Sequence, residues 1–346
     1  MRVFGFAGTG KTTMAKEIAE SINGVVHFMA FTGKAALVLR KKGCTGASTI
    51  HGAIYKPKED DFGHTEFVWN PDGPLSIANL AVVDEGSMVG PDIGKDVLRY
   101  GTKVLVLGDP FQLQPVSGEG FFTNCEPDIL LTEIHRQAAD NPIIRMSMDI
   151  REGRGLSIGT YGNSRVVRRA DIGKDELRDL VMGADQLLCG KNATRQTFNN
   201  RVRQITTLPA RDQEWMPVEG DRLICLKNNN MKGLLNGGLW NVHKVEKYDG
   251  RNITMLVDNL DDDSVPRTDV EVPYQFFTGG EKDLDWRVRK QSDEFTYGYA
   301  MTVHKSQGSQ FDNVVLFDES AIFRDQQAQH QYTGVTRAAE RVTVVI

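Results

Sequence analysis

Eight residues near the N-terminal end carry the spacing of a phosphate-binding loop. Residues 5–12, Gly-Phe-Ala-Gly-Thr-Gly-Lys-Thr, fit the pattern GxxxxGK[ST]. The glycines let backbone N–H groups curl around phosphate oxygens, and a following helix adds its dipole. Lys11 can reach the β- and γ-phosphates, and the Thr12 hydroxyl can hold Mg²⁺. The motif predicts a nucleoside triphosphate site; an ordinary glycine-rich turn is the alternative.

Two further segments end in polar side chains that such a site needs. Asp84 follows the apolar run 80–83 and would hold Mg²⁺ through a water. Glu85 would orient or deprotonate an attacking water, which is typical of a triphosphate hydrolase rather than a kinase. Gln112 follows the apolar run 103–107 and is the candidate sensor of the γ-phosphate. The alternatives are a capping Asp-Glu pair and a surface turn.

Short apolar strands alternate with helical periods at both ends of the chain, which predicts an α/β fold with helices on both faces of a parallel sheet. The N-terminal half breaks this rhythm at residues 53–74, a polar, turn-rich stretch with four aromatic residues that we expect to form a hairpin. From about 215 to 286 the period changes to short strands between turns, which predicts a small all-β insert. The expected strands are 3–6, 25–31, 80–83 and 103–107, and the expected helices are 12–22, 34–42 and 141 to about 152.

The composition is that of an ordinary soluble protein with two or three domains. The chain has 346 residues, 40% of them hydrophobic, and a net charge of −5, so a nucleic-acid site must be a local cleft. No apolar run approaches the length of a membrane span. The cysteines stand far apart, which disfavours a zinc ribbon or a disulfide framework and favours a reducing cytoplasm. They are Cys44, Cys125, Cys189 and Cys225.

Seven ordered segments, spread almost from end to end, together resemble the motifs of superfamily 1B DNA helicases of the RecD-like and phage Dda-like type. The resemblance implies two RecA-like domains with a β-hairpin pin and an SH3-like β-barrel. The implied boundaries are 1–150 for the first RecA-like domain, 151–214 with 287–346 for the second, about 53–74 for the pin and 215–286 for the barrel. Besides the phosphate loop, the segments are 31–36, 48–51, 84–88, 108–116, 131–137, 299–308 and 332–338.

The resemblance also implies that the triphosphate is ATP, bound with Mg²⁺ at Thr12 and Asp84. Arg136 and Arg337 would be the arginine fingers that neutralise charge on the transferred phosphoryl group. With Lys11, Glu85 and Gln112 they form the expected catalytic set. The expected nucleotide contacts are Gly8, Thr9, Gly10, Lys11, Thr12, Thr13, Asp84, Glu85, Gln112, Arg136, Gly308 and Arg337.

A single-stranded DNA track is implied in the same way, with contacts to phosphate and sugar that do not read sequence. Phe31 would add base stacking. The expected DNA contacts are Phe31, Thr32, Thr49, His51, Thr302, His304 and Lys305, and the expected wedge of the strand-separating pin is Phe62, Phe67 and Trp69.

The resemblance therefore implies an ATP-dependent DNA helicase that moves 5′→3′ on single strands and unwinds forked duplex. A monomer in the cytoplasm of a bacterial or phage-infected cell is expected, with a single-strand-binding protein or replication and recombination factors as further partners. The alternatives are a DNA-stimulated translocase subunit that does not unwind, and a DNA-binding protein with an impaired nucleotide site.

Two departures from the family pattern bear on nucleotide choice. Only residues 1–4 precede the phosphate loop, where the family carries a segment with an adenine-reading glutamine. Gln310 stands where related motifs often have a glutamate. The alternatives are that the chain is a fragment, or that base recognition is weakened or supplied elsewhere. We also expect a ribose or domain contact at Gln310 to differ.

Overall fold

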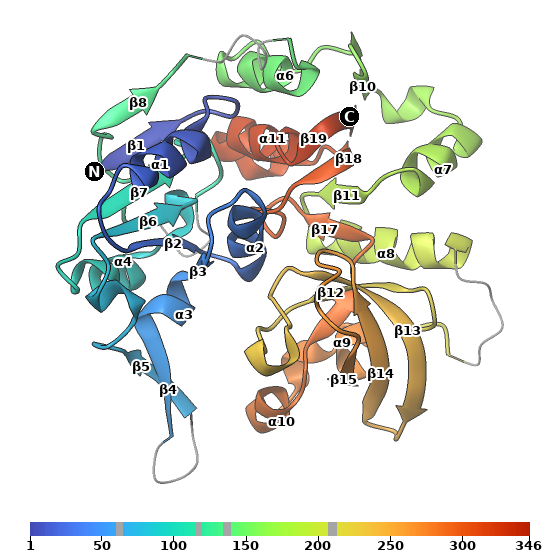
Figure 1. Ribbon diagram of the computed structural model, residues 1–346. Helices are drawn as coiled ribbons and strands as arrows, with labels where there is room; N and C mark the ends of the chain where they lie inside the picture. Colours follow the sequence, from blue (N-terminus) through green and yellow to red (C-terminus); the bar gives the residue numbers. More distant parts are fainter. Residues whose placement is uncertain (60–64, 115–119, 134–139, 207–212) are drawn as a thin grey trace. The chain divides into compact units, whose positions relative to one another are not determined.

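The computed structural model describes residues 1–59, 65–114, 120–133, 140–206 and 213–346 (Figure 1). The chain divides into two compact units. Unit 1 comprises Met1–Val166, Gln307–Gln310 and Ser320–Val342, and unit 2 comprises Val167–Ser306, Phe311–Glu319 and Thr343–Ile346. Within the described ranges, no helix has both the length and the apolar character needed to cross a bilayer.

Unit 1 is built on a six-stranded parallel sheet with the order β3-β2-β6-β7-β1-β8. The strands β6 and β7 are buried along nearly their whole length, as expected for a parallel sheet covered on both faces. The predicted parallel sheet is confirmed. Its strands are β1 (Arg2–Gly5), β2 (Val26–Ala30), β3 (Ser48–Thr49), β6 (Leu80–Asp84), β7 (Val104–Gly108) and β8 (Ile129–Leu131).

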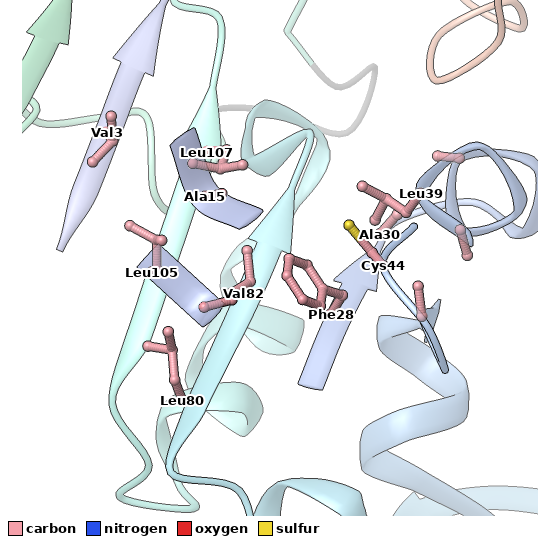
Figure 2. Close-up of a cluster of buried hydrophobic side chains, with 14 residues drawn as sticks. Val3, Ala15, Phe28, Ala30, Leu39, Cys44, Leu80, Val82, Leu105 and Leu107 are labelled. Atoms are coloured by element: carbon pink, nitrogen blue, oxygen red, sulfur yellow. The ribbon is translucent and has the colours of Figure 1, made fainter. Parts of the chain in front are cut away.

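Alternate side chains of these strands enter two separate cores. Figure 2 shows one core, where Val82, Leu105 and Leu107 pack with Ala15 of α1 and Leu39 of α2. The neighbouring residues Val83 and Val106 point to the other face, into a core shared with α3 and α4. The helices of unit 1 are α1 (Lys11–Glu20), α2 (Gly33–Lys41), α3 (Ile50–Ile54), α4 (Pro91–Leu98), α6 (Pro142–Arg151) and α11 (Gln327–Val335), with 3₁₀ turns at Pro74–Ser76, Gly86–Met88 and Ser320–Gln326.

The predicted hairpin is present as the antiparallel strands β4 (Tyr55–Glu59) and β5 (Thr65–Trp69). Trp69 pairs with Tyr55 at the base of the hairpin, where its ring lies 5.0 Å from that of Tyr100 and under the guanidinium of Arg99. Phe67 is 67% exposed. The predicted wedge residue Phe62 lies outside the described residues.

The antiparallel pair β9 (Gly159–Tyr161) and β10 (Ser164–Val167) belongs to unit 1 except for Val167, with which unit 2 begins. The backbone N–H of Val342, in β19 (Ala338–Val345), donates to the Ser164 hydroxyl over 3.1 Å. Residues 320–342 therefore belong to unit 1 together with the N-terminal sheet. This grouping differs from the expected domain boundary at residue 150.

In unit 2, β11 (Gln186–Cys189) runs parallel to and between β17 (Ala300–Thr302) and β18 (Phe311–Phe317). Asn199 of α8 holds β17 by accepting from the Ala300 N–H over 2.8 Å. The helices beside these strands are α7 (Lys174–Met182) and α8 (Asn192–Thr206), with a 3₁₀ turn at Arg169–Asp171.

The predicted all-β insert is a five-stranded antiparallel sheet with its own core, in the order β15-β14-β13-β12-β16. The sheet extends past the expected boundary at residue 286, because Phe295 and Tyr297 of β16 are buried in the insert's core. Gly298 then lets the chain pass within contact of the Leu223 backbone and continue into β17. The elements are β12 (Arg222–Cys225), β13 (Leu239–Tyr248), β14 (Asn252–Asn259), β15 (Thr268–Pro273), β16 (Phe295–Tyr297), α9 (Gln275–Thr278) and α10 (Trp286–Gln291), with 3₁₀ turns at Asn230–Lys232 and Glu281–Asp283.

Candidate nucleotide and nucleic-acid sites

The phosphate-binding loop lies between the end of β1 and the start of α1. Its curvature depends on Gly8 and Gly10, whose φ angles of 80° and 75° lie in the left-handed region. The Thr9 hydroxyl donates to the Phe6 carbonyl over 2.9 Å, so this side chain braces the loop itself. The Lys11 ammonium donates to the carbonyls of Gly5 and Phe6 over 2.7 and 2.9 Å. These bonds hold the Lys11 ammonium against the loop, where a bound phosphate can replace the two carbonyls as its partner.

A cavity of about 590 Å³ lies over this loop, and all of its lining residues belong to unit 1. The structure therefore brings most of the predicted nucleotide contacts together around one cavity. Thr9 lies in the loop but does not line this cavity, and Arg136 falls outside the described residues. The predicted residues that line the cavity are Gly8, Gly10, Lys11, Thr12, Thr13, Asp84, Glu85, Gln112, Gly308 and Arg337.

Two adjacent carboxylates enter the cavity from the end of β6. Burial, together with the charge of Glu85, raises the pKa of Asp84 to about 6, and Lys11 opposes this shift. Glu85 adopts the left-handed conformation, with φ 53° and ψ 44°, and its N–H donates to Asp84 Oδ1 over 2.9 Å. A non-glycine residue held in this conformation stores strain of about 1–2 kcal/mol, a cost often found at functional sites.

The donor set at this edge of the cavity fits Mg²⁺, a hard cation that prefers oxygen ligands. Thr12 offers a hydroxyl and Asp84 a carboxylate, and both line the same cavity. No cluster of three His, Cys, Asp or Glu side chains suited to a metal occurs in the described ranges. The usual Mg²⁺ site of nucleotide enzymes has one or two protein oxygens that act together with phosphates and waters, and Thr12 and Asp84 can supply them.

Gln112 lies beyond the end of β7 and is 6% exposed. Its Oε1 atom has no hydrogen-bond partner among the described residues, although the side chain lines the cavity. Leaving a buried amide oxygen unpaired costs about 1–3 kcal/mol. Gln112 is therefore suited to form its missing hydrogen bond with a bound ligand or with an attacking water.

Arg337 approaches the cavity from the end of α11 and is 5% exposed. Its Nε donates to the Thr333 carbonyl over 3.1 Å, and a terminal nitrogen donates to the Ser309 carbonyl over 3.2 Å. Carbonyl partners orient the guanidinium without cancelling its charge. The positive charge therefore stays available to a phosphate.

Two residues that the sequence analysis did not single out connect the parts of this site. The Tyr332 hydroxyl accepts from the Ala7 N–H over 2.8 Å and donates to Asp109 Oδ2 over 2.7 Å. Burial raises the pKa of Asp109, and the Tyr332 hydrogen bond opposes this shift. Asp109 follows β7 as Asp84 ends β6, which is the signal that could have identified it. Lys16, Lys42 and Cys44 also line the cavity without having been predicted.

The DNA-contact candidates of unit 1 cluster at two helix N-termini. The hydroxyls of Thr32 and Thr49 cap α2 and α3 by accepting from the N–H groups of Ala35 and Gly52. Each hydroxyl keeps its own proton, which it can donate to a phosphate. The His51 ring lies 4.9 Å from that of Tyr55, and burial lowers the pKa of His51. Phe31 packs half-buried against the core.

The remaining DNA-contact candidates, Thr302, His304 and Lys305, belong to unit 2. Thr302 is 9% exposed, and its hydroxyl accepts from the Lys305 N–H over 3.3 Å. The Lys305 ammonium donates to Asn236 Oδ1 of the β insert over 2.5 Å, and burial lowers its pKa. Burial also lowers the pKa of His304. Lys305 is thus engaged by the insert, a contact that its sequence motif did not indicate.

A glycine-rich loop between a parallel strand and a helix, facing an acidic pair on a neighbouring strand, defines a P-loop nucleotide-binding protein. Residues 1–171 match the family described as AAA domain, and residues 297–345 match the UvrD-like helicase C-terminal domain. These two matches, together with the relatives described next, support a superfamily 1B helicase of the RecD-like type.

Individual relatives agree with this assignment. The ATP-dependent RecD2 DNA helicase of Deinococcus radiodurans is 29% identical over 359 residues, covering 97% of this chain and 45% of that protein. The ATP-dependent DNA helicase dda of phage T4 is 30% identical over 227 residues, covering 58% and 48%. A structure of two coordinating Pif1 helicases at forked double-stranded DNA has the same fold, with a TM-score of 0.58 at 20% identity and coverage of 99% and 87%. The chain spans about half the length of these two curated relatives.

Proposed function

We propose that this chain is the motor of an ATP-dependent DNA helicase that moves along single-stranded DNA and unwinds forked duplex. The observation that carries the proposal is the shared cavity of unit 1, into which Lys11, Asp84, Glu85, Gln112 and Arg337 all project. A chain that only bound DNA would not need, at one phosphate loop, two acids, an arginine and a buried glutamine whose Oε1 atom has no partner among the described residues.

In the proposed mechanism each of these residues has a step in triphosphate hydrolysis. Lys11 leaves its carbonyl partners to neutralise the β- and γ-phosphates, while Thr12 and Asp84 would hold Mg²⁺, which supplies charge compensation when bound. Glu85 accepts the proton of the attacking water, and Gln112 orients that water or senses the γ-phosphate. Arg337, joined by Arg136, stabilises the charge that develops on the transferred group.

The DNA track is proposed on the relatives' names and on the chemistry of the candidate side chains. RecD2 and dda are named as DNA helicases, and the Pif1 structure concerns unwinding at forked double-stranded DNA. Capping hydroxyls, helix N-termini and imidazoles suit a phosphate backbone bound without sequence preference. We assign 5′→3′ movement, and strand separation by the β4–β5 hairpin with Phe62, Phe67 and Trp69.

We extend the proposal to the domain organisation, the oligomeric state, the partners and the cellular location. The units act as two RecA-like domains, and the five-stranded sheet acts as an SH3-like barrel beside the track. The chain works as a monomer, with a single-strand-binding protein or replication and recombination factors as partners. The buried free thiols of Cys44, Cys189 and Cys225 suit the reducing cytoplasm of a bacterial or phage-infected cell.

The deciding experiment measures ATP hydrolysis with and without single-stranded DNA, and unwinding of a fork with a 5′ single-stranded tail. We expect DNA to stimulate hydrolysis and ATP to drive unwinding, with a fork bearing only a 3′ tail as the polarity control. Hydrolysis that single strands stimulate, without unwinding of any fork, would favour a translocase subunit. No hydrolysis under any of these conditions would reject the motor proposal.

A further inference from the structure

One buried tyrosine joins two loops of the nucleotide site. Tyr332 lies on α11 and is 1% exposed. Its hydroxyl accepts from the N–H of Ala7, in the phosphate loop, and donates to Asp109, which begins the segment that carries Gln112. Ala7, Asp109 and Gln112 line the cavity, whereas Tyr332 contacts it through them. A single oxygen atom therefore fixes the separation of the two loops.

The segment beyond Asp109 has little freedom once this bond is made. Asp109 Oδ1 accepts from the Phe111 N–H over 3.0 Å, and the Gln112 N–H donates to the Asp109 carbonyl over 3.3 Å. The Phe111 ring meets the Tyr332 ring edge-on, with centroids 5.2 Å apart. The backbone of Gln112 is thus tied to Asp109, and Asp109 is tied to Tyr332.

The far end of the same segment is held by two more residues from the C-terminal part of the chain. The Leu113 N–H donates to the Thr333 hydroxyl over 3.0 Å, and its carbonyl accepts from Gln307 Nε2 over 2.9 Å. Leu113 is fully buried. The segment 109–113 is therefore anchored at both ends, and Tyr332 alone of these anchors also bonds the phosphate loop.

We propose that Tyr332 is a positioning residue for hydrolysis, whose hydroxyl sets where Gln112 stands relative to the phosphate loop. The inference rests on the proposed function. Displacing a catalytic group by about 1 Å can cost on the order of 10²-fold in rate, whereas the affinity of the loop for bound phosphates depends mainly on Lys11 and the backbone. Loss of the hydroxyl should therefore act on turnover more than on nucleotide affinity.

The variant Tyr332→Phe keeps the ring against Phe111 and removes only the oxygen. We expect kcat for ATP hydrolysis to fall about tenfold or more, while KM changes by less than about threefold. The matched control is Tyr161→Phe, because the Tyr161 hydroxyl donates to the Ser157 carbonyl over 3.0 Å elsewhere in unit 1. The control should leave kcat and KM unchanged. Equal kcat in Tyr332→Phe and wild type would overturn the proposal.

A double-mutant cycle tests whether Tyr332 acts through Gln112. In a Gln112→Ala background, Tyr332→Phe should cause little further loss of kcat, and fully additive losses would reject the coupling. Thr333→Val removes the second anchor of the segment and should lower kcat in the same direction. This variant keeps the proposal testable if Tyr332→Phe folds poorly.

Hydrogen exchange provides a readout that needs no nucleotide. In Tyr332→Phe the Ala7 amide loses its acceptor, so its exchange should accelerate at least about tenfold relative to wild type and to Tyr161→Phe. Unchanged exchange at Ala7 would contradict the proposed bond. A wild-type chain that shows this protection yet hydrolyses no ATP would reject the proposed function and leave the bond standing, so the two failures are distinguishable.

Discussion

Lys11 and Arg337 line the same cavity, although one begins the first helix of the chain and the other follows its last helix. Among the described residues, the Arg337 guanidinium donates to the Thr333 and Ser309 carbonyls and to the Thr336 hydroxyl, which leave its positive charge in place. Both cations can therefore act on one bound triphosphate. In the proposed mechanism Lys11 contacts both the β- and γ-phosphates whereas Arg337 acts on the γ-phosphate alone, and this difference can be measured with a nucleotide that lacks the γ-phosphate.

We expect Lys11→Ala to abolish hydrolysis and to weaken ADP binding, because Lys11 compensates charge on the β-phosphate as well. Arg337→Ala should lower kcat by about 10³-fold or more while ADP affinity stays within about threefold, because its role is confined to the transferred group. Titration calorimetry with ADP and steady-state ATPase assays separate the two. Equal losses of affinity and turnover in Arg337→Ala would indicate a structural role.

Magnesium affinity should depend on pH through Asp84. Burial raises the pKa of this carboxyl from 3.8 to about 6, so it is largely protonated at about pH 5 and ionised at about pH 7. Binding of Mg²⁺ with ADP should therefore strengthen as the pH rises through this range. Asp84→Asn should flatten the dependence, and the same slope in this variant would show that another group titrates.

The raised pKa of Asp84 also determines how the free energy of unfolding changes with pH when no metal is bound. Between pH 3.8 and about 6 the folded chain binds more protons at Asp84 than the unfolded chain does. The free-energy contribution of Asp84 to folding must therefore fall as the pH rises through that window. Denaturant titrations of wild type and Asp84→Asn should converge at the acid end and diverge toward neutral pH, with the asparagine variant the more stable.

The backbone conformation of Glu85 predicts that a variant with glycine at this position is more stable than one with alanine. Glu85→Ala keeps a Cβ at a positive φ, whereas Glu85→Gly does not. The glycine variant should have a free energy of unfolding about 1 kcal/mol higher than the alanine variant, although glycine normally destabilises. Both variants should lose hydrolysis. A more stable alanine variant would argue against strain at this position.

The hairpin offers a matched pair of aromatic residues. Phe67 is exposed, so Phe67→Ala should change stability by less than about 0.5 kcal/mol while it reduces fork unwinding and spares DNA-stimulated hydrolysis. Trp69 packs on Tyr100 and Arg99, so Trp69→Ala should lower the free energy of unfolding by about 2 kcal/mol. Normal unwinding by Phe67→Ala would remove this side chain from the proposed wedge.

The nucleotide site was largely predictable from sequence because its chemistry is local. A short loop fixes Lys11 and Thr12, and strand ends fix Asp84 and Gln112, so spacing alone places them at one sheet edge. Tyr332 could not be assigned in this way, because its two bonds join segments distant in the chain. The limit of the β insert was missed for a related reason. Phe295 and Tyr297 resemble any apolar strand, and only packing shows which core they enter.

The contribution of the C-terminal segment to unit 1 affects how the protein is made. Tyr332, Thr333 and Arg337 are translated long after the phosphate loop, yet they belong to the same unit, and Arg337 lines the cavity over that loop. During translation the sheet of unit 1 can form early. The Ala7 N–H and the Asp109 carboxylate lack their hydrogen-bond partner until Tyr332 has been synthesised. A nascent chain that lacks residues 332–337 can therefore form much of the unit 1 sheet while the cavity over its phosphate loop is still incomplete.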